Sequence, residues 1–205
     1  MSNFEYVDNI YRSRITILDI LEKRGYNVSI YRKFSPAEIS IATEFFPSLS
    51  FQVEKTADKT QKCIVKYAKL SRQKLETVFD DIAEDDVKNT EVIVMMAEPV
   101  ADVHHVSAIK QFMTRKLRIS FFCVQTIVNN PMKHVMVPLH EIVPKDEHKK
   151  LLESLFITIA SKLPLIRFHA DPIVRCLGAV PGDIVKITRP SPSAGEYIVH
   201  RFVSL

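Results

Sequence analysis

The sequence predicts an α/β (α+β) fold in two domains, and three observations support this. Helical and strand patterns alternate along 205 residues, a length that suits one large domain or two small ones. A content of 46% hydrophobic and 25% charged residues is that of an ordinary globular protein. Eight of the 11 prolines lie from Pro131 onward, so we place a boundary there. We expect an N-terminal α/β domain with a mixed sheet (1–130) and a small C-terminal α+β domain (131–205).

The first element is expected to be a helix over about residues 8–24. Asp8 is placed to cap its start, and Gly25 stands where a left-handed residue commonly ends a helix. Ser35-Pro36-Ala37-Glu38 has the pattern of a second helix start. The apolar residues of the first helix share one face because they recur at spacings of four, three and three: Tyr11, Ile15, Leu18 and Leu21.

The rest of the N-terminal domain is expected to alternate strands and helices. The continuous apolar run 91–96 is typical of a strand buried on both faces at the centre of a sheet. The remaining predictions are strands over 50–54, 62–67 and 119–124, and helices over 72–82 and 106–117.

The C-terminal domain is expected to begin with two short extended pieces around prolines, 135–137 and 141–143. Pro144 can then start a helix that runs to about residue 163. Strands over 183–189 and 197–203, joined by the turn cluster 190–195, predict a β-hairpin. The helix would bury one apolar stripe: Leu151, Leu152, Leu155, Phe156 and Ile159.

The charge and the cysteines set limits on the partners and the compartment. A net charge of +4 permits contact with nucleic acid but does not demand it. Basic residues recur over 55–74 and 115–118, where they can hold phosphates or simply form a solvated strand edge. Three widely spaced cysteines suggest reduced thiols. The polar start does not resemble a signal peptide, and no apolar run is long enough to predict a membrane span.

Residue patterns for catalysis are weak. The sequence has no Cys pair at zinc-site spacing, no nucleophile elbow and no Gly-rich phosphate loop. We therefore expect no catalytic residue, no metal, no cofactor and no small-molecule substrate. The acidic cluster 80–86, with Asp86-x-Lys88, leaves a metal-dependent nuclease as the alternative, weighed against a solvated helix end. A free-standing DNA-binding protein is a third hypothesis.

The last 75 residues carry a series of uncommon motifs in a fixed order. They include His134-Val-Met-Val-Pro138-Leu-His140, Asp171-Pro172-Ile-Val-Arg175, Gly182-Asp-Ile-Val-Lys-Ile-Thr-Arg189-Pro190-Ser191, Ala194-Gly195-x-Tyr197 and Arg201-Phe-Val. This series resembles the shared fifth subunit of eukaryotic nuclear RNA polymerases and its shorter archaeal counterpart. The N-terminal half, with Arg24-Gly25-Tyr26 and Glu91-Val-Ile-Val, resembles the eukaryotic long form more weakly.

The resemblance implies a non-catalytic polymerase subunit. Its C-terminal domain would be an assembly module on the largest subunit, and its N-terminal domain a jaw near downstream DNA. The loop that would face DNA is Pro99-Val100-Ala101, although the preceding Glu98 would repel phosphate. The implied docking residues are His134, Pro138, His140, Asp171, Pro172, Arg175, Arg189, Pro190, Ser191, Gly195, Tyr197 and Arg201.

Several positions depart from the family pattern. Leu165 stands where the family has Arg, Cys176 follows Arg175 in place of Tyr, and Glu196 reverses a positive charge before Tyr197. Such changes suit a partner surface that has changed as well. The length and divergence suggest a version from a large cytoplasmic DNA virus, most like that of African swine fever virus. We expect the host cytoplasm and the virion in that case, and the nucleus for a cellular homologue.

Overall fold

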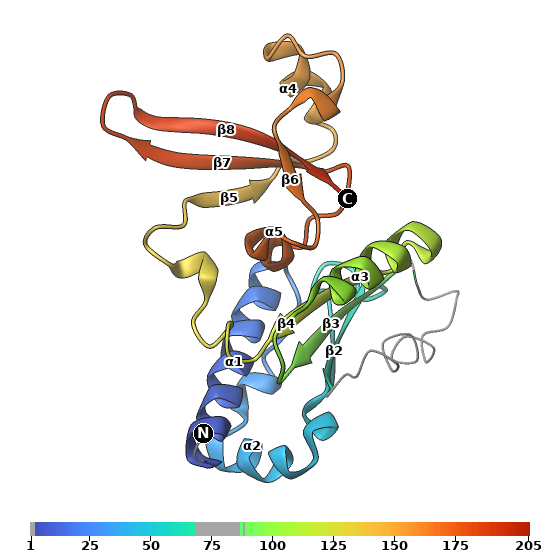
Figure 1. Ribbon diagram of the computed structural model, residues 1–205, viewed down its shortest axis with the longest axis vertical. Coiled ribbons are helices and arrows are strands. Elements are labelled where there is room, and N and C mark those ends of the chain that lie inside the picture. The colour runs from blue at the N-terminus through green and yellow to red at the C-terminus, as the bar shows by residue number, and fades with distance from the viewer. Residues whose placement is uncertain (1–2, 69–86, 88) are drawn as a thin grey trace. The chain divides into compact units, whose positions relative to one another are not determined.

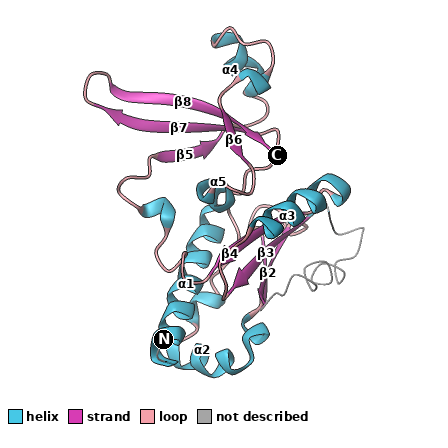
Figure 2. Cartoon of the chain, viewed as in Figure 1, coloured by secondary structure: helices cyan, strands magenta, loops and turns pink. Residues whose placement is uncertain are grey.

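The computed structural model describes residues 3–68, 87 and 89–205 of the chain (Figure 1). The predicted helix over 72–82 and the acidic cluster 80–86 lie outside these residues. Internal contacts divide the chain into two compact units, Met1–Asn130 and Pro131–Leu205, here called the N-terminal and C-terminal units. Each unit contains helices together with a mixed sheet, so the predicted α+β class is confirmed (Figure 2).

The N-terminal unit is built on a mixed sheet with the order β1-β2-β3-β4. The first pair of strands is antiparallel and the other two pairs are parallel. The apolar run of the sequence becomes β3, and all seven of its residues are buried. The strands are β1 (Phe51–Glu54), β2 (Lys62–Ala68), β3 (Thr90–Met96) and β4 (Arg118–Cys123).

The first helix, α1 (Asn3–Lys23), is longer than its apolar spacing predicts. Asp8 lies inside it, 3.8 Å from Arg12 one turn further on, so the prediction that Asp8 caps the helix is wrong. The predicted end is confirmed, because Gly25 adopts φ +86° and the Tyr26 N–H donates to the Leu21 carbonyl at 3.0 Å. Among the described residues no helix, α1 included, is both long enough and apolar enough to cross a membrane.

The other helices of this unit are α2 (Pro36–Ala42) and α3 (Asp102–Arg115). Ser35 and Glu38 form the capping box expected from the Ser-Pro-Ala-Glu sequence. Helix α3 packs on one sheet face through Ala108, which shares a core cluster with Val92, Val94 and Phe121. A 3-10 helix lies on each side of α2, at Tyr31–Lys33 and at Thr43–Leu49.

Glu91 lies at the start of β3 on the opposite sheet face from Val92, within a buried charged cluster. The carboxylate accepts from Arg24, which follows α1, and from the Tyr26 hydroxyl at 3.3 Å, and lies 3.5 Å from Arg118 on β4. Burial opposes the charge, but Arg118 and Arg24 outweigh it and hold the pKa of Glu91 below its usual value. Burial also lowers the pKa of Arg118 to about 10. The cluster ties the end of α1 to the sheet.

The C-terminal unit contains a second mixed sheet, with the order β5-β7-β8-β6. Strands β7 and β8 form the predicted hairpin, with β5 antiparallel to β7 and β6 parallel to β8. Strand β6 and helix α5 were not predicted from the sequence. The elements are β5 (Leu139–Ile142), α4 (His148–Ser154), β6 (Leu165–Arg167), α5 (Pro172–Leu177), β7 (Ile184–Ser191) and β8 (Gly195–Ser204), with 3-10 helices at Pro131–Lys133 and Ala160–Lys162.

The predicted helix over 144–163 is wrong in its extent. Helix α4 covers His148–Ser154, because Phe156 adopts φ +54° and the Ile157 N–H bonds back to the Leu152 carbonyl. This turn packs Leu152 and Ile157 against the core. The predicted stripe therefore fails at Leu155, Phe156 and Ile159, all of which are exposed.

Two smaller predictions in this unit are also wrong. The segment 135–137 forms a turn rather than an extended piece, with the Val137 N–H donating to the His134 carbonyl at 2.9 Å. The hairpin turn is shorter than the cluster 190–195, because β7 continues through Pro190 to Ser191. Proline is tolerated there because it lies near the end of the strand.

Candidate docking surface

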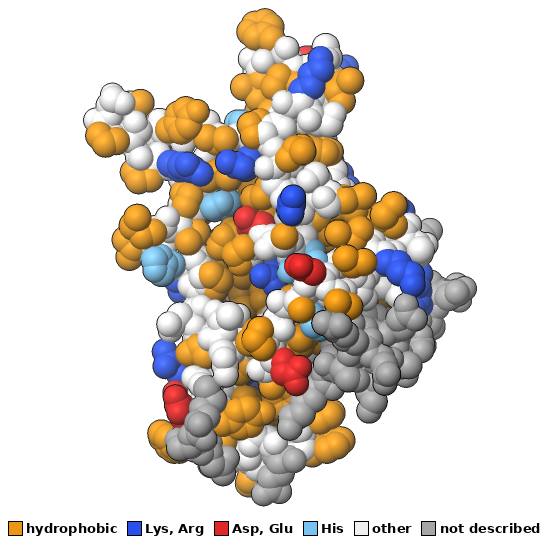
Figure 3. All heavy atoms as spheres, in the orientation of Figure 1, with side chains coloured by type: hydrophobic (Ala, Val, Ile, Leu, Met, Phe, Trp, Pro, Cys, Tyr) orange, Lys and Arg blue, Asp and Glu red, His pale blue; other side chains and the backbone are white. Residues whose placement is uncertain are grey.

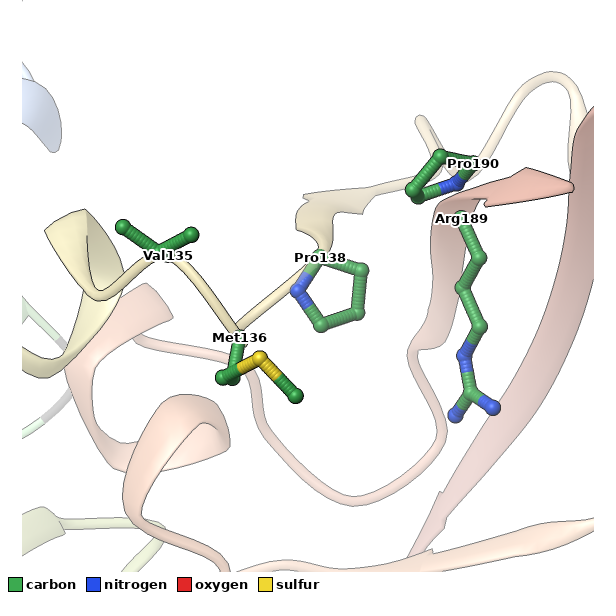
Figure 4. A pocket seen from close by; sticks show the side chains of 5 residues that line it. All are labelled: Val135, Met136, Pro138, Arg189 and Pro190. Atoms are coloured by element: carbon green, nitrogen blue, oxygen red, sulfur yellow. The ribbon is translucent and has the colours of Figure 1, made fainter.

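Three of the predicted docking residues line one hollow in the C-terminal unit. Pro138, Arg189 and Pro190 surround it together with Val135 and Met136, and its volume is about 450 Å³. Figure 4 shows Pro138 between Met136 on one side and Arg189 with Pro190 on the other. The Val135 side chain is 96% exposed although it is aliphatic. The hollow therefore exposes apolar surface beside one guanidinium group.

Strand pairing explains why residues so distant in sequence meet here. Leu139 at the start of β5 is opposite Thr188 of β7, which brings Pro138 beside Arg189 and Pro190. Across the hairpin, Arg189 is opposite Tyr197, whose side chain is 58% exposed. We call Val135, Met136, Pro138, Arg189, Pro190 and Tyr197 the hairpin surface. Figure 3 shows hydrophobic and basic side chains close together over this part of the unit.

Four predicted docking residues have local structural roles. His134 Nδ1 accepts from the Met136 N–H at 3.1 Å, and His140 Nδ1 lies 2.7 Å from the Pro138 carbonyl. The Ser191 hydroxyl accepts from the Ala194 N–H in the hairpin turn, where Gly195 supplies φ +74°. These contacts shape the two loops that carry the hairpin surface.

Three further predicted residues belong to α5. Asp171 caps this helix by accepting from the Ile173 and Val174 N–H groups at 2.9 and 3.0 Å, and Pro172 occupies the first turn. Arg175 is half-buried on the same helix, and burial lowers its pKa. The capping of α5 therefore explains the Asp171-Pro172 pair without a contact to another subunit.

Arg201, the last predicted docking residue, lies apart from the hollow. Its Nη1 donates to the Leu165 carbonyl of β6 at 3.1 Å, so it supports the pairing of β6 with β8. Three ionisable side chains form a row across neighbouring strands: Glu141, Lys186 and His200. Partial burial and the adjacent Lys186 lower the pKa of His200.

Val135 and Met136 were missed by sequence reasoning. Their apolar character suggested an extended piece. Both side chains are exposed because the segment forms a turn instead. An available signal was the proline on each side, Pro131 and Pro138, which makes a regular strand between them short.

The loop predicted to face DNA lies between β3 and α3 in the N-terminal unit. Pro99 is exposed, whereas Val100 packs partly against the core cluster on that sheet face. The Ala101 N–H donates to His104 Nδ1 at 3.0 Å, which fixes the first turn of α3. Glu98 is exposed beside them and adds negative charge to the loop.

Metal ligands and thiols can be assessed for the part of the chain that the structure describes. Within residues 3–68, 87 and 89–205, no group of three or more His, Cys, Asp or Glu side chains could hold a metal ion. Cys63, Cys123 and Cys176 are buried free thiols. The residues on which the nuclease alternative depends, 80–86, lie outside the described part of the chain.

Comparison with known proteins matches the C-terminal unit most strongly. Residues 129–203 match the family model "RNA polymerase Rpb5, C-terminal domain". The DNA-directed RNA polymerase subunit Rpo5 of Pyrococcus horikoshii is 53% identical over 74 residues, which are 36% of this chain and 88% of that protein.

The chain belongs to the Rpb5/Rpo5 family of RNA polymerase subunits.

Relatives differ in how much of this Rpb5/Rpo5 chain they match. Rpo5 of Methanocaldococcus jannaschii is 44% identical over 70 residues, 34% of this chain and 87% of that protein. By contrast, the DNA-directed RNA polymerases I, II, and III subunit rpabc1 of Dictyostelium discoideum is 28% identical over 202 residues, 96% of this chain and 98% of that protein. The long relative therefore matches both units, as the resemblance of the N-terminal half suggested.

Proposed function

We propose that this Rpb5/Rpo5 chain is a non-catalytic subunit of a multisubunit DNA-directed RNA polymerase and docks on the largest subunit through its C-terminal unit. The observation that carries the proposal is the hairpin surface, which lies within the region matching the family model. Apolar groups such as Val135 and Met136, beside the guanidinium of Arg189, suit a protein partner, since aromatic residues, Met and Arg are enriched at interfaces.

The N-terminal unit would then act as a jaw near downstream DNA within the assembly. Two observations support a role that depends on the other subunits. The net charge of +4 is too small to hold DNA tightly on its own, and Glu98 stands beside Pro99 on the loop in question. Free chain should therefore bind DNA weakly.

We also propose that the chain comes from a large cytoplasmic DNA virus, with a counterpart in African swine fever virus, and works in the host cytoplasm and the virion. Length and divergence support this proposal, since the archaeal relatives match about a third of this chain and the long relative is 28% identical over 202 residues. A cellular homologue would instead enter the nucleus. Fractionation of producing cells with an antibody to the chain distinguishes the two compartments.

Affinity purification tests the polymerase role. Tagged full-length chain, expressed with the polymerase subunits of the same genome, should recover the largest subunit in equal molar amount. Lys150→Glu on α4 changes an exposed charge away from the hairpin surface and should recover as much. Recovery of the tagged chain without the largest subunit would overturn the proposal.

A further inference from the structure

The outer edge of β8 is open over most of its length. Strand β8 runs over Gly195–Ser204, but β6 pairs only with Phe202, Val203 and Ser204. Among the strands that the structure describes, no other pairs on this side of β8. Seven residues, Gly195 to Arg201, thus present a strand edge without a neighbour there.

The hydrogen bonds of β8 show which backbone groups face outward. The Phe202 N–H donates away from β7 to the Pro164 carbonyl, and the Ser204 carbonyl accepts from the Phe168 N–H. Val203 bonds on the β7 side instead, with Asp183 and Gly182. Because the direction alternates along a strand, the N–H and C=O groups of Ile198 and His200 point outward.

The side chains along this edge add apolar surface. Tyr197 is 58% exposed and Ile198 is 47% exposed, and they lie on opposite faces of the hairpin because they are neighbours in a strand. Natural proteins blunt such edges or pair them, since an exposed apolar edge recruits another strand. Here the edge carries Glu196 near one end and His200 with Arg201 at the other.

We propose that the β8 edge accepts an extended strand from another polymerase subunit, which extends the sheet next to Tyr197–His200; this rests on the proposed function. Only an extended polypeptide offers acceptors and donors at the spacing of Ile198 and His200. The incoming strand is apolar at its centre, where it would lie beside Tyr197 and Ile198. Tyr197 is opposite Arg189, so one partner can cover the hairpin surface and this edge together.

A second copy of the chain is the rival occupant. Antiparallel pairing of two β8 edges about Ile198 would place Glu196 opposite His200 and Tyr197 opposite Val199. This overlap ends at Phe202, where β6 begins to pair with β8. The surface area that so few residues bury is smaller than the roughly 1,000 Å² of a stable interface. A partner that also contacts the hairpin surface has no such limit.

Hydrogen exchange of the full-length chain, free and in purified polymerase, tests the proposal. In the free chain the amides of Ile198 and His200 should exchange rapidly, whereas those of Val199 and Arg201, which face β7, are protected. In the polymerase, exchange at Ile198 and His200 should slow by at least about tenfold. Unchanged exchange at both amides in a polymerase that contains the chain would overturn the edge proposal and leave the proposed function intact.

Two variants at one position separate the backbone from the side chain. Ile198→Pro removes an outward N–H, while Ile198→Thr keeps it and reduces the apolar surface. Recovery of the polymerase should fall about fivefold more for Ile198→Pro, the value of one net hydrogen bond. Equal recovery with both variants, each folded by circular dichroism, would contradict the proposal. A dimeric mass of the free chain with slow exchange at Ile198 would assign the edge to a second copy instead.

Discussion

The two units bury a mixed sheet in different ways. In the N-terminal unit, all seven residues of β3 are buried, and the charged residue at its start, Glu91, pairs with Arg24 and Arg118. In the C-terminal unit, Val203 is the one fully buried residue of β8, and the hairpin leaves Tyr197 exposed. The first sheet supplies its own unit with a core, whereas the second leaves apolar surface available to a partner.

The largest effect on stability is expected from a substitution in the buried charged cluster around Glu91. Glu91→Gln leaves the positive charges of Arg24 and Arg118 close together without their shared carboxylate. Breaking a buried ion pair costs about 3–5 kcal/mol, so the free energy of unfolding should fall by that order. Urea denaturation followed by far-UV circular dichroism measures the change.

The matched control lies in the other unit. Glu141 on β5 is 3.9 Å from Lys186, and both side chains are substantially exposed. Glu141→Gln should therefore cost about 0–1 kcal/mol, as exposed pairs do. Equal losses for Glu91→Gln and Glu141→Gln would contradict the distinction between an enclosed and an open unit.

The same charged cluster should make the stability of the chain depend on pH. The pKa of Glu91 is lowered on folding from its usual 4.5, so its stabilising effect is complete above pH 4.5 and is lost as the pH falls through the folded value. Between about pH 6 and about pH 3, the wild-type chain should lose more stability than Glu91→Gln does. Parallel slopes of unfolding free energy against pH for the two proteins would rule out the effect.

The next effect concerns docking rather than stability. Arg189→Glu reverses the charge beside the hollow and should weaken binding to the polymerase by about 2 kcal/mol, the size typical of an interface hot spot. Because Arg189 is exposed, unfolding free energy should change by less than about 0.5 kcal/mol. Quantitative pull-down and thermal unfolding of the same preparation separate the two quantities.

A smaller effect is expected at the start of α5. Asp171→Ala removes the acceptor for two backbone N–H groups and should cost about 1 kcal/mol. Asp171→Asn keeps a capping oxygen and should retain most of the stability. Urea denaturation of the two variants measures the difference in the free energy of unfolding. If Asp171→Ala lost docking without losing stability, Asp171 would be a docking residue rather than a cap.

Two features of the N-terminal unit were predicted from local signals in the sequence. Gly25 ends α1 as expected, and the apolar run before Met96 forms the buried strand, because each depends on residues close together in the chain. The end of α4 was missed because Phe156 takes a left-handed conformation that favours glycine, stabilised by the packing of Ile157.

The candidate site was harder to predict because it depends on long-range pairing. The resemblance implied that Pro138, Arg189 and Pro190 are docking residues. It did not predict that they line one hollow. The register of β5 against β7 brings them together, and a shift of one residue would turn these side chains to the other face. Asp171 and Arg201 were grouped with them although their contacts are internal to the unit.

One purification tests the central claim that the hairpin surface of the C-terminal unit docks the polymerase. Full-length wild-type chain, the double variant Arg189→Glu/Tyr197→Ser and the control Lys150→Glu are tagged and expressed with the polymerase subunits of the same genome. Wild type and control should recover the largest subunit in equal molar amount, while the double variant loses it and still unfolds at the wild-type temperature. Full recovery with the double variant would contradict the account.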